Sequence, residues 1–550
     1  MTIEPTLPPA SARLLVKHPL DVRVRGGIVR GVREGGMLAW RGIPYAAPPV
    51  GALRFRAPQP ALPWEGVRDA SRYGNIATQP HRGQFKGVDP RVPAGEDCLT
   101  INVLSAVVTG RRKRLGMPVM VNIHGGGYST GSSQDFSGQG VGFVQSGRVV
   151  YVSFNYRLGP LGYLHFDRYA TPEHPIESNL GLRDQVAALE WVHDNIRAFG
   201  GDPNNVTVFG ESAGGNAVTT LMTTPAAAGL FARAIAQSPP SNAVYPRELS
   251  DSWAAEFMTL LRAHLSSPPP VPTGIPGRLF AGRGAASAPS DPSMTELSDA
   301  ELLMTVDVDA LMSASLALQL RVPDEYPGTF CLAPVVDGTF LPERPLAAFQ
   351  AGRAHRVPLI IGTNEREGSA FRGRVEILPS TPGRIRPLFE QSPPASREAL
   401  WLAYPGLPAP RPAADFAGDS AFWFPSVMVC DYHSRYAPVH AYRFDLAPRL
   451  MRLLGFDATH GIEMLTLFDR AATPASRTMT ALGGRELFLR AGERMRRHWL
   501  RFAFNGVVDE MWPAYTEDAR LTLIIDGDDR VESDPRGKRR RAWTAFLPGI

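Results

Sequence analysis

The feature that most constrains the fold of this chain is a Gly-x-Ser-x-Gly motif at residues 210–214. An apolar, β-branched run at 206–209 precedes it, and a run typical of a helix follows at 216–222. A serine at such a strand-to-helix junction stands on a sharp, strained turn, where small neighbours are needed because the turn leaves little room for side chains. The motif therefore predicts that Ser212 is a nucleophile and that the protein is a hydrolase.

A second Gly-x-Ser-x-Gly match surrounds Ser129, so the motif must be weighed by its context. This match also follows an apolar run, but the residues after it, 131–138, are rich in Gly and Ser and indicate a loop. Only Ser212 is followed by a helical pattern. We therefore expect Ser212 to be the nucleophile and Ser129 to be an ordinary loop serine.

Apolar strand-like runs alternate with helical ones along the chain. Residues 184–199 carry apolar side chains at helical spacing and end at two glycines, which predicts an amphipathic helix. The strand-like runs are residues 117–123, 148–154, 205–209, 357–361, 439–444 and 521–525. Strands that alternate with helices predict an α/β fold with a large, mostly parallel central sheet flanked by helices.

The 550 residues are expected to form one large domain, although length alone would allow several. Residues 266–293 are rich in Pro, Gly, Ala and Ser and predict a flexible insertion rather than a domain boundary. Strands that one sheet would need lie on both sides of this segment. The expected domain therefore spans residues 1–550.

Charge and cysteine content exclude several classes of partner and site. With 58 basic and 53 acidic residues, the net charge of +5 calls for neither nucleic acid nor an acidic membrane. The basic run at 536–541 is interpreted as a solvated helix face. Cys98, Cys331 and Cys430 are far apart and form no Cys-x-x-Cys motif, which argues against a zinc site and a disulfide framework.

The sequence also predicts a cytoplasmic location. Residues 1–10 have neither the basic nor the apolar region of a signal peptide. No run of about 18 apolar residues indicates a transmembrane helix. Few, scattered cysteines fit a reducing compartment.

A nucleophilic serine needs a base to take its proton and an acid to orient the base. In α/β-hydrolases both partners follow the serine, the acid first and then the histidine. The loop after the strand at 357–361 offers Glu365 and Glu367, and position alone does not separate them. Asp337 is a third candidate, but it precedes a glycine and is interpreted as a turn residue.

Four histidines come after these acids: His433, His440, His460 and His498. His440 lies within a strand pattern, and His498 lies in an arginine-rich helix where we expect it to be exposed. His433 has no motif around it. His460 lies in a loop bounded by glycines, the kind of segment that often carries catalytic residues.

The sequence His124-Gly-Gly-Gly127 follows a predicted strand and leaves backbone N–H groups uncovered by side chains. It matches the oxyanion loop of esterases and lipases. A phosphate-binding loop is the alternative, but no Gly-Lys-Ser/Thr follows and no Gly-x-Gly-x-x-Gly opens a helix.

Together these motifs resemble the type-B carboxylesterase/lipase family, which includes bacterial esterases and cholinesterases. The resemblance runs from about Val24 to Leu547. Besides the motifs above, it rests on residues 42–51, 96–102, 155–159, 179–185, 334–338 and 512–515. It implies an α/β-hydrolase fold with an active-site gorge. The family's roles fall on Ser212 as nucleophile, Glu367 as acid, His460 as base, and the amides of Gly126, Gly127 and Ala213 as the oxyanion hole.

The chain departs from the family pattern at two places. Secreted relatives bond the cysteine equivalent to Cys98 to an upstream cysteine, but Ala77 stands near the expected place here. Pro239 follows Ser238 where relatives usually have glycine. Because proline fixes φ and removes an N–H donor, we expect the backbone to shift there and a supporting role of Ser238 to be in doubt.

The resemblance implies hydrolysis of carboxylic esters through an acyl-enzyme, with no metal or organic cofactor. A lipase or amidase with the same triad is the nearest alternative, and a non-catalytic binding protein on the same scaffold is a more distant one. The expected partner is a small-molecule ester, with no nucleic acid and no membrane. The sequence indicates neither the ester nor the oligomeric state. The aromatic residues 422–424 either line the gorge or belong to the core.

Overall fold

The computed structural model describes residues 18–80, 92–107, 116–147, 149–266, 296–371, 377–390, 392–470 and 473–546. The insertion predicted at 266–293 lies outside these residues except for Ser266, the last residue of α7 (Arg247–Ser266).

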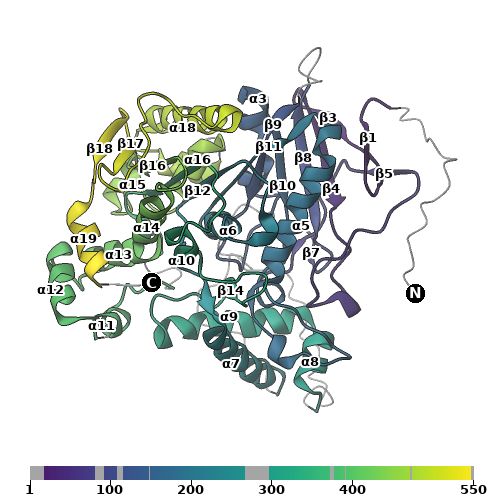
Figure 1. Cartoon of the computed structure of the whole chain (residues 1–550), viewed down its shortest axis with the longest axis horizontal. Coiled ribbons are helices and arrows are strands. Elements are labelled where there is room, and N and C mark those ends of the chain that lie inside the picture. Colours follow the sequence, from purple (N-terminus) through teal and green to yellow (C-terminus); the bar gives the residue numbers. More distant parts are fainter. Residues whose placement is uncertain are drawn as a thin grey trace.

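One sheet runs through the described part of the chain, with the strands nearest the C-terminus at one edge and those nearest the N-terminus at the other (Figure 1). Its eleven strands, in spatial order, are β18 (Arg530–Ser533), β17 (Leu521–Ile525), β16 (Val439–Phe444), β15 (Leu359–Asn364), β12 (Arg233–Gln237), β11 (Gly201–Glu211), β9 (Met117–Ile123), β10 (Val150–Phe154), β8 (Thr100–Ala106), β4 (Met37–Pro44) and β3 (Val32–Glu34). A smaller sheet of β1 (Asp21–Val24), β2 (Gly27–Arg30) and β5 (Val67–Asp69) lies beside it.

The seven central strands from β17 to β10 are parallel to their neighbours, and only the strands at the two edges pair antiparallel. The predicted mostly parallel sheet is therefore confirmed, and each strand predicted from the sequence is present with shifts of a few residues at its ends. The predicted helix at 184–199 is α5 (Leu180–Asn195) followed by one 3₁₀ turn.

Helices cover both faces of the sheet because the central strands are apolar on both sides. In β9, Val119 and Val121 pack into one core and Met120 into the other. The first core includes α5 and α6 (Ala213–Leu221), and the second includes α3 (Val141–Gly147), α16 (Ile462–Leu467) and α18 (Arg485–Asn505). This alternation fixes the register of the strands and therefore the positions of the loops that follow them.

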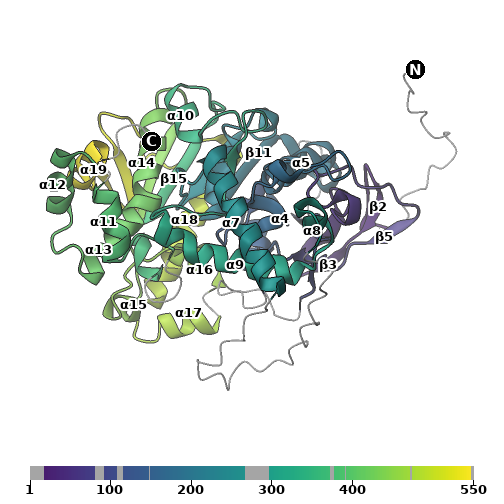
Figure 2. The same ribbon diagram turned by 90° about the horizontal axis from the view of Figure 1, so that it is seen from below.

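Helices α7 and α9 (Val308–Glu325) lie below the sheet in Figure 1 and in front of it in Figure 2. None of the described helices combines the length and apolar character needed to cross a bilayer.

The interpretation of residues 536–541 as a solvated helix face is wrong for most of the run. Arg536 and Arg539 both bond the buried carboxylate of Asp419, and Arg540 bonds Asp534. Lys538 and Arg541 are the exposed basic residues of the run. Arg536, just before α19 (Gly537–Phe546), and Arg539 and Arg540 within it are therefore paired with acids of the same chain.

Candidate active site

Ser212 stands between the end of β11 and the start of α6. Its backbone has φ 60° and ψ −124°, a conformation that residues other than glycine rarely adopt. The Ser212 N–H donates to the carbonyl of Gln237 at 2.9 Å, which ties the turn to the end of β12. The sheet and the helix therefore hold the serine in a strained position at the carboxyl end of the sheet.

The two glycines of the motif are required by close backbone contacts. A Cβ at Gly210 would lie 2.5 Å from the carbonyl oxygen of Ile123 in β9, and a Cβ at Gly214 would collide with the same oxygen. Any side chain at either position would push α6 away from the sheet. The local sequence around Ser212 is thus set by how tightly the helix packs on β9.

Glu367 and His460 meet from two separate loops. Glu367 begins the short helix that follows β15, and His460 lies just before α16. His460 Nδ1 lies 2.6 Å from Glu367 Oε2, and the Glu367 side chain is 1% exposed. The second oxygen of Glu367 accepts hydrogen bonds from the Asn364 N–H at 2.5 Å and from Ser238 Oγ at 2.7 Å.

The other acid candidates lie elsewhere. The carbonyl of Glu365 accepts a hydrogen bond from Arg536, and the charges that act on its carboxyl are those of Asp445, Arg536, Asp457 and Arg443. Asp337 accepts from the N–H groups of Thr339, Phe340 and Leu341, which confirms it as a turn residue.

The other histidines have structural surroundings. His433 is buried against the carbonyl of Val357, and His440 is buried in β16. His498 is half-buried against the ring of Trp512 rather than exposed, so that expectation is wrong.

The far side of the imidazole faces Glu211, the residue immediately before Ser212. His460 Nε2 lies 3.2 Å from Glu211 Oε1. Within the described part of the chain, neither Nε2 nor the Ser212 hydroxyl makes a hydrogen bond. Catalytic hydrogen bonds are often loose before substrate binds.

Three backbone N–H groups lie beside Ser212. Gly126 and Gly127 follow β9, and among the described residues no hydrogen bond from their N–H groups is seen. Ala213 is the first residue of α6, whose N–H has no partner within the helix. These groups are available to a developing negative charge.

All these groups line one cavity of about 450 Å³. Its polar lining residues include Ser212, His460 and Glu211, and the glycine loop lines it as well. Apolar residues from α9, the segment around Phe330, and the rings of Phe371 and Phe422 also line it. A volume of this size accommodates a small organic molecule.

Comparison with known proteins shows the family of this chain. The sequence model of the Carboxylesterase family matches residues 18–381. The chain is 34% identical to the para-nitrobenzyl esterase of Bacillus subtilis (strain 168) over 540 residues, 94% of this chain and 97% of the relative. The chain belongs to the carboxylesterase family.

Other members and solved structures extend the similarity. Mouse cholinesterase is 28% identical over 584 residues, covering 96% of this chain and 87% of the relative. A solved PNB esterase superposes with a TM-score of 0.77 at 33% identity over 95% of this chain and 99% of its own. The fold of this carboxylesterase is therefore the α/β-hydrolase fold, and the protein is a serine-dependent carboxylic-ester hydrolase.

In this carboxylesterase Ser238 bonds Glu367 despite the proline that follows it. Its hydroxyl donates to Glu367, and its N–H donates to the Gly362 carbonyl at 2.8 Å. Pro239 therefore leaves this contact in place, although the proline had put a supporting role of Ser238 in doubt. The backbone adapts by a positive φ of 45° at Ser238.

Two further acids of the carboxylesterase site, Glu211 and Glu463, were not singled out from the sequence. Burial alone lowers the pKa of His460, but the charges of Glu211 and Glu367 outweigh burial and raise this pKa to about 9. Burial, followed by the charges of Glu211 and Glu367, raises the pKa of the fully buried Glu463 carboxyl to about 8. The only signal in the sequence was their place, one residue before the serine and three after the histidine.

Outside the cavity of this carboxylesterase, one group of described residues has the donor types of a metal site. The ligand atoms of His165, Asp167 and Asp251 lie within 4.8 Å of one another. Arg247 pairs with Asp167 at 2.6 Å, so a cation already neutralises this cluster.

Proposed function

We propose that this carboxylesterase hydrolyses small carboxylic esters with Ser212 as nucleophile, His460 as general base and Glu367 as the orienting acid. The observation that carries the proposal is the 2.6 Å contact between Glu367 and His460, together with one cavity that both His460 and Ser212 line. In this arrangement Glu367 holds Nδ1 of His460, and Nε2, which lies 3.2 Å from Glu211 Oε1 in this structure, is the nitrogen that would take the serine proton.

The reaction proceeds in two halves. Ser212 Oγ attacks the ester carbonyl while His460 Nε2 takes its proton, and the resulting oxyanion accepts hydrogen bonds from the amides of Gly126, Gly127 and Ala213. His460 then gives the proton to the leaving alcohol. Water attacks the acyl-enzyme in the same way, and the acid and the free serine are released.

Glu367 fixes the tautomer and stabilises the imidazolium. It remains a carboxylate throughout, so its Ser238 and Asn364 hydrogen bonds stay on the charged form. No metal or organic cofactor takes part in this proposal.

A lipase or an amidase with the same triad is the alternative. The mostly apolar cavity accepts esters of various acyl and alcohol sizes, so a panel of chain lengths, with and without an emulsified interface, separates esterase from lipase. Anilide analogues of the best ester test for amidase activity.

The test of the proposal is the pre-steady-state reaction with p-nitrophenyl acetate. We expect a burst of one nitrophenolate per active site in the parent and no burst in S212A or H460A, because neither variant forms the acyl-enzyme at a useful rate. A parent without a burst or turnover would favour a non-catalytic binding protein on this scaffold.

We also propose that residues 1–550 act as one domain and that the enzyme works in the cytoplasm. The three free, buried cysteines support a reducing compartment. The proposal includes no nucleic acid and no membrane partner.

A further inference from the structure

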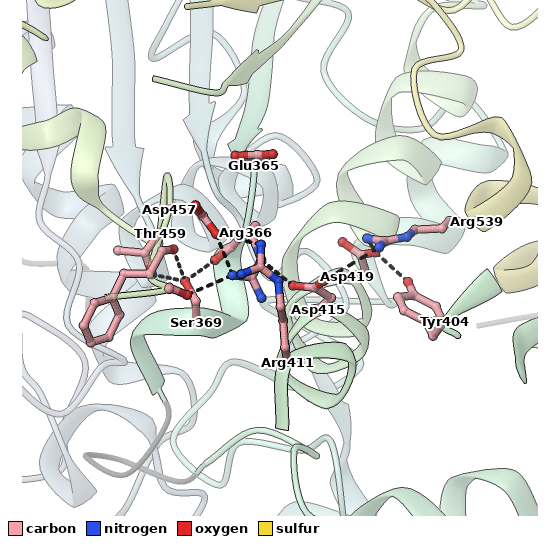
Figure 3. Close-up of polar contacts among 12 residues, drawn as sticks. Glu365, Arg366, Ser369, Tyr404, Arg411, Asp415, Asp419, Asp457, Thr459 and Arg539 are labelled. Carbon is pink, nitrogen blue, oxygen red and sulfur yellow. Dashed lines mark hydrogen bonds and ion pairs between the residues drawn. The ribbon is translucent and has the colours of Figure 1, made fainter. Parts of the chain in front are cut away.

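Arg366 lies between the two acids Glu365 and Glu367, in the loop that carries the proposed catalytic acid. Its side chain is only 6% exposed. Figure 3 shows the guanidinium between Asp457 on one side and Asp415 on the other. A buried guanidinium with two carboxylate partners is a specific arrangement, because each partner must satisfy part of its planar fork of donors.

One side of the Arg366 guanidinium binds the histidine loop. Its Nη1 donates to the Gly455 carbonyl and to Asp457 Oδ2, both at 2.8 Å. The Arg366 backbone N–H also donates to the Ala458 carbonyl at 2.9 Å. These contacts end two residues before His460, so they fix the segment that leads into the imidazole.

Asp457, the carboxylate held by Arg366, has a positive φ of 53°. Aspartate adopts this left-handed conformation more readily than most residues other than glycine. Arg366 and Arg411 both donate to Asp457 Oδ2, at 2.8 and 3.0 Å. The two arginines therefore hold the side chain of the residue at which the histidine loop bends.

The other side of the guanidinium binds a third element. Arg366 Nε donates to Asp415 Oδ1 at 2.7 Å, in α13 (Pro410–Gly418). Helix α13 packs directly on the acid loop, because a Cβ at Gly368 would collide with the carbonyl of Ala414. Asp415 thus anchors Arg366 to a rigid helix.

Ser369 joins the same two loops a second time. Its hydroxyl lies 2.7 Å from Thr459 Oγ1 and donates to the Phe456 carbonyl at 2.6 Å (Figure 3). Ser369 is buried and its hydroxyl is uncharged. It therefore joins the two loops but orients them less than the charged fork of Arg366 does. Arg366 links its own loop to both the histidine loop and α13, whereas Arg411, a residue of α13, links only α13 to the histidine loop.

We propose that Arg366 is a positioning residue that fixes the loop of Glu367 and the loop of His460 relative to each other. Its guanidinium does so by binding Asp415 in α13 and Asp457 in the histidine loop. This inference rests on the proposed roles of Glu367 and His460. Arginine is required because its rigid fork reaches both carboxylates and a carbonyl at once, whereas a lysine ammonium is a single point charge on a flexible stem.

The test is R366K, which keeps the charge and loses the fork. The matched control is R411K, because Arg411 binds the same oxygen of Asp457 but is 61% exposed. Activity is expressed per serine titrated by an organophosphate, so misfolded protein does not count. We expect kcat per titrated serine to fall about 10- to 100-fold in R366K with KM unchanged, and to stay within about twofold in R411K.

The pH profile provides a readout that a merely structural role would not move. His460 is faced by Glu211 from β11, Glu367 from the acid loop and Glu463 from α16, and by the rings of Phe371 and Phe422. If Glu367 moves away, the pKa of His460 falls and the acid limb of kcat/KM moves to lower pH. R366K does not change the charge, so this shift reports geometry.

An R366K enzyme with parental kcat per titrated serine and an unmoved acid limb would overturn the inference. So would a loss of titratable serines with unchanged kcat per serine, which indicates folding alone. If R366K cannot be purified, D457N weakens the same contact between Arg366 and Asp457. It is then judged by kcat per titrated serine and by the position of the acid limb, as for R366K. S212A and H460A are measured alongside: activity in them refutes the triad, whereas their inactivity beside an unaffected R366K refutes only the role of Arg366.

Discussion

His460 Nε2 lies 3.2 Å from Glu211 Oε1. This nitrogen is the atom that must accept the proton of Ser212 in the proposed reaction. Glu211 therefore stabilises the imidazolium from the side of the serine, while Glu367 stabilises it from the other side at 2.6 Å. Two carboxylates on one imidazole favour its charged form, with direct consequences for the pH at which the enzyme works.

The first consequence concerns the pH profile of the parent enzyme. A general base must be neutral to accept a proton, and the charges around His460 raise its pKa from the ordinary 6.5 to about 9. Activity should therefore be lost as pH falls below this raised pKa. We expect kcat/KM for a neutral ester to rise from about pH 6 to about pH 9. A profile that is already flat above about pH 7 would contradict the raised pKa.

The second prediction removes one of the two charges. Glu211→Gln keeps the shape of the side chain and deletes its charge, so the pKa of His460 should fall and the acid limb of kcat/KM should move down by about one pH unit or more. Glu365→Gln is the control, because Glu365 lies in the acid loop but is not among the acids whose charges raise the pKa of His460, which are Glu211, Glu367 and Glu463. An acid limb that stays in place in E211Q, or moves equally in E365Q, would count against the role of Glu211.

The third prediction concerns Ser238. Ser238→Ala removes a hydrogen bond from a buried carboxylate, which costs about 1–3 kcal/mol of stability and should lower kcat without raising KM. Ser241→Ala is a matched control, because Ser241 is buried nearby in sequence and its hydroxyl has no hydrogen-bond partner within the described residues. Thermal unfolding and steady-state kinetics measure both effects. Equal behaviour of S238A and S241A would show that the Ser238 contact is unimportant.

The fourth prediction tests the packing of the elbow. Gly214→Ala places a methyl group against the Ile123 carbonyl, so we expect a loss of about 1–3 kcal/mol or more and few titratable serines. In contrast, a Cβ at Gly383 in α11 (Pro382–Glu390) meets nothing within 4 Å. Gly383→Ala should therefore leave activity intact and raise stability by up to about 1 kcal/mol. A G214A enzyme with parental stability would refute the tight contact.

Much of the fold could be predicted because its signals are local. The runs that became β9, β10, β15 and β17 are mostly apolar, as expected for strands buried on both faces. The sequence could not indicate where isolated charges end up. Arg536 and Arg539 looked like solvent-facing residues because their partner, Asp419, lies more than a hundred positions earlier.

The candidate site shows the same limit. The order of the strands and the positions of the glycines predicted Ser212 and the loops that carry the acid and the histidine. Only the resemblance to a family identified Glu367 rather than Glu365 as the acid. Their side chains diverge because the chain turns into a short 3₁₀ helix at Glu367. Glu211 stood inside the motif, yet the motif does not show that its carboxylate lies 3.2 Å from Nε2 of His460, a residue of a distant loop.

The most direct test of the central claim is to label the enzyme with an organophosphate and map the modified peptide. The account predicts one phosphoryl group per chain, on Ser212, with hydrolysis lost in step with labelling and no labelling of S212A or H460A. An adduct on Ser129 or any other residue, or a fully labelled Ser212 in an enzyme that still hydrolyses esters, would contradict it.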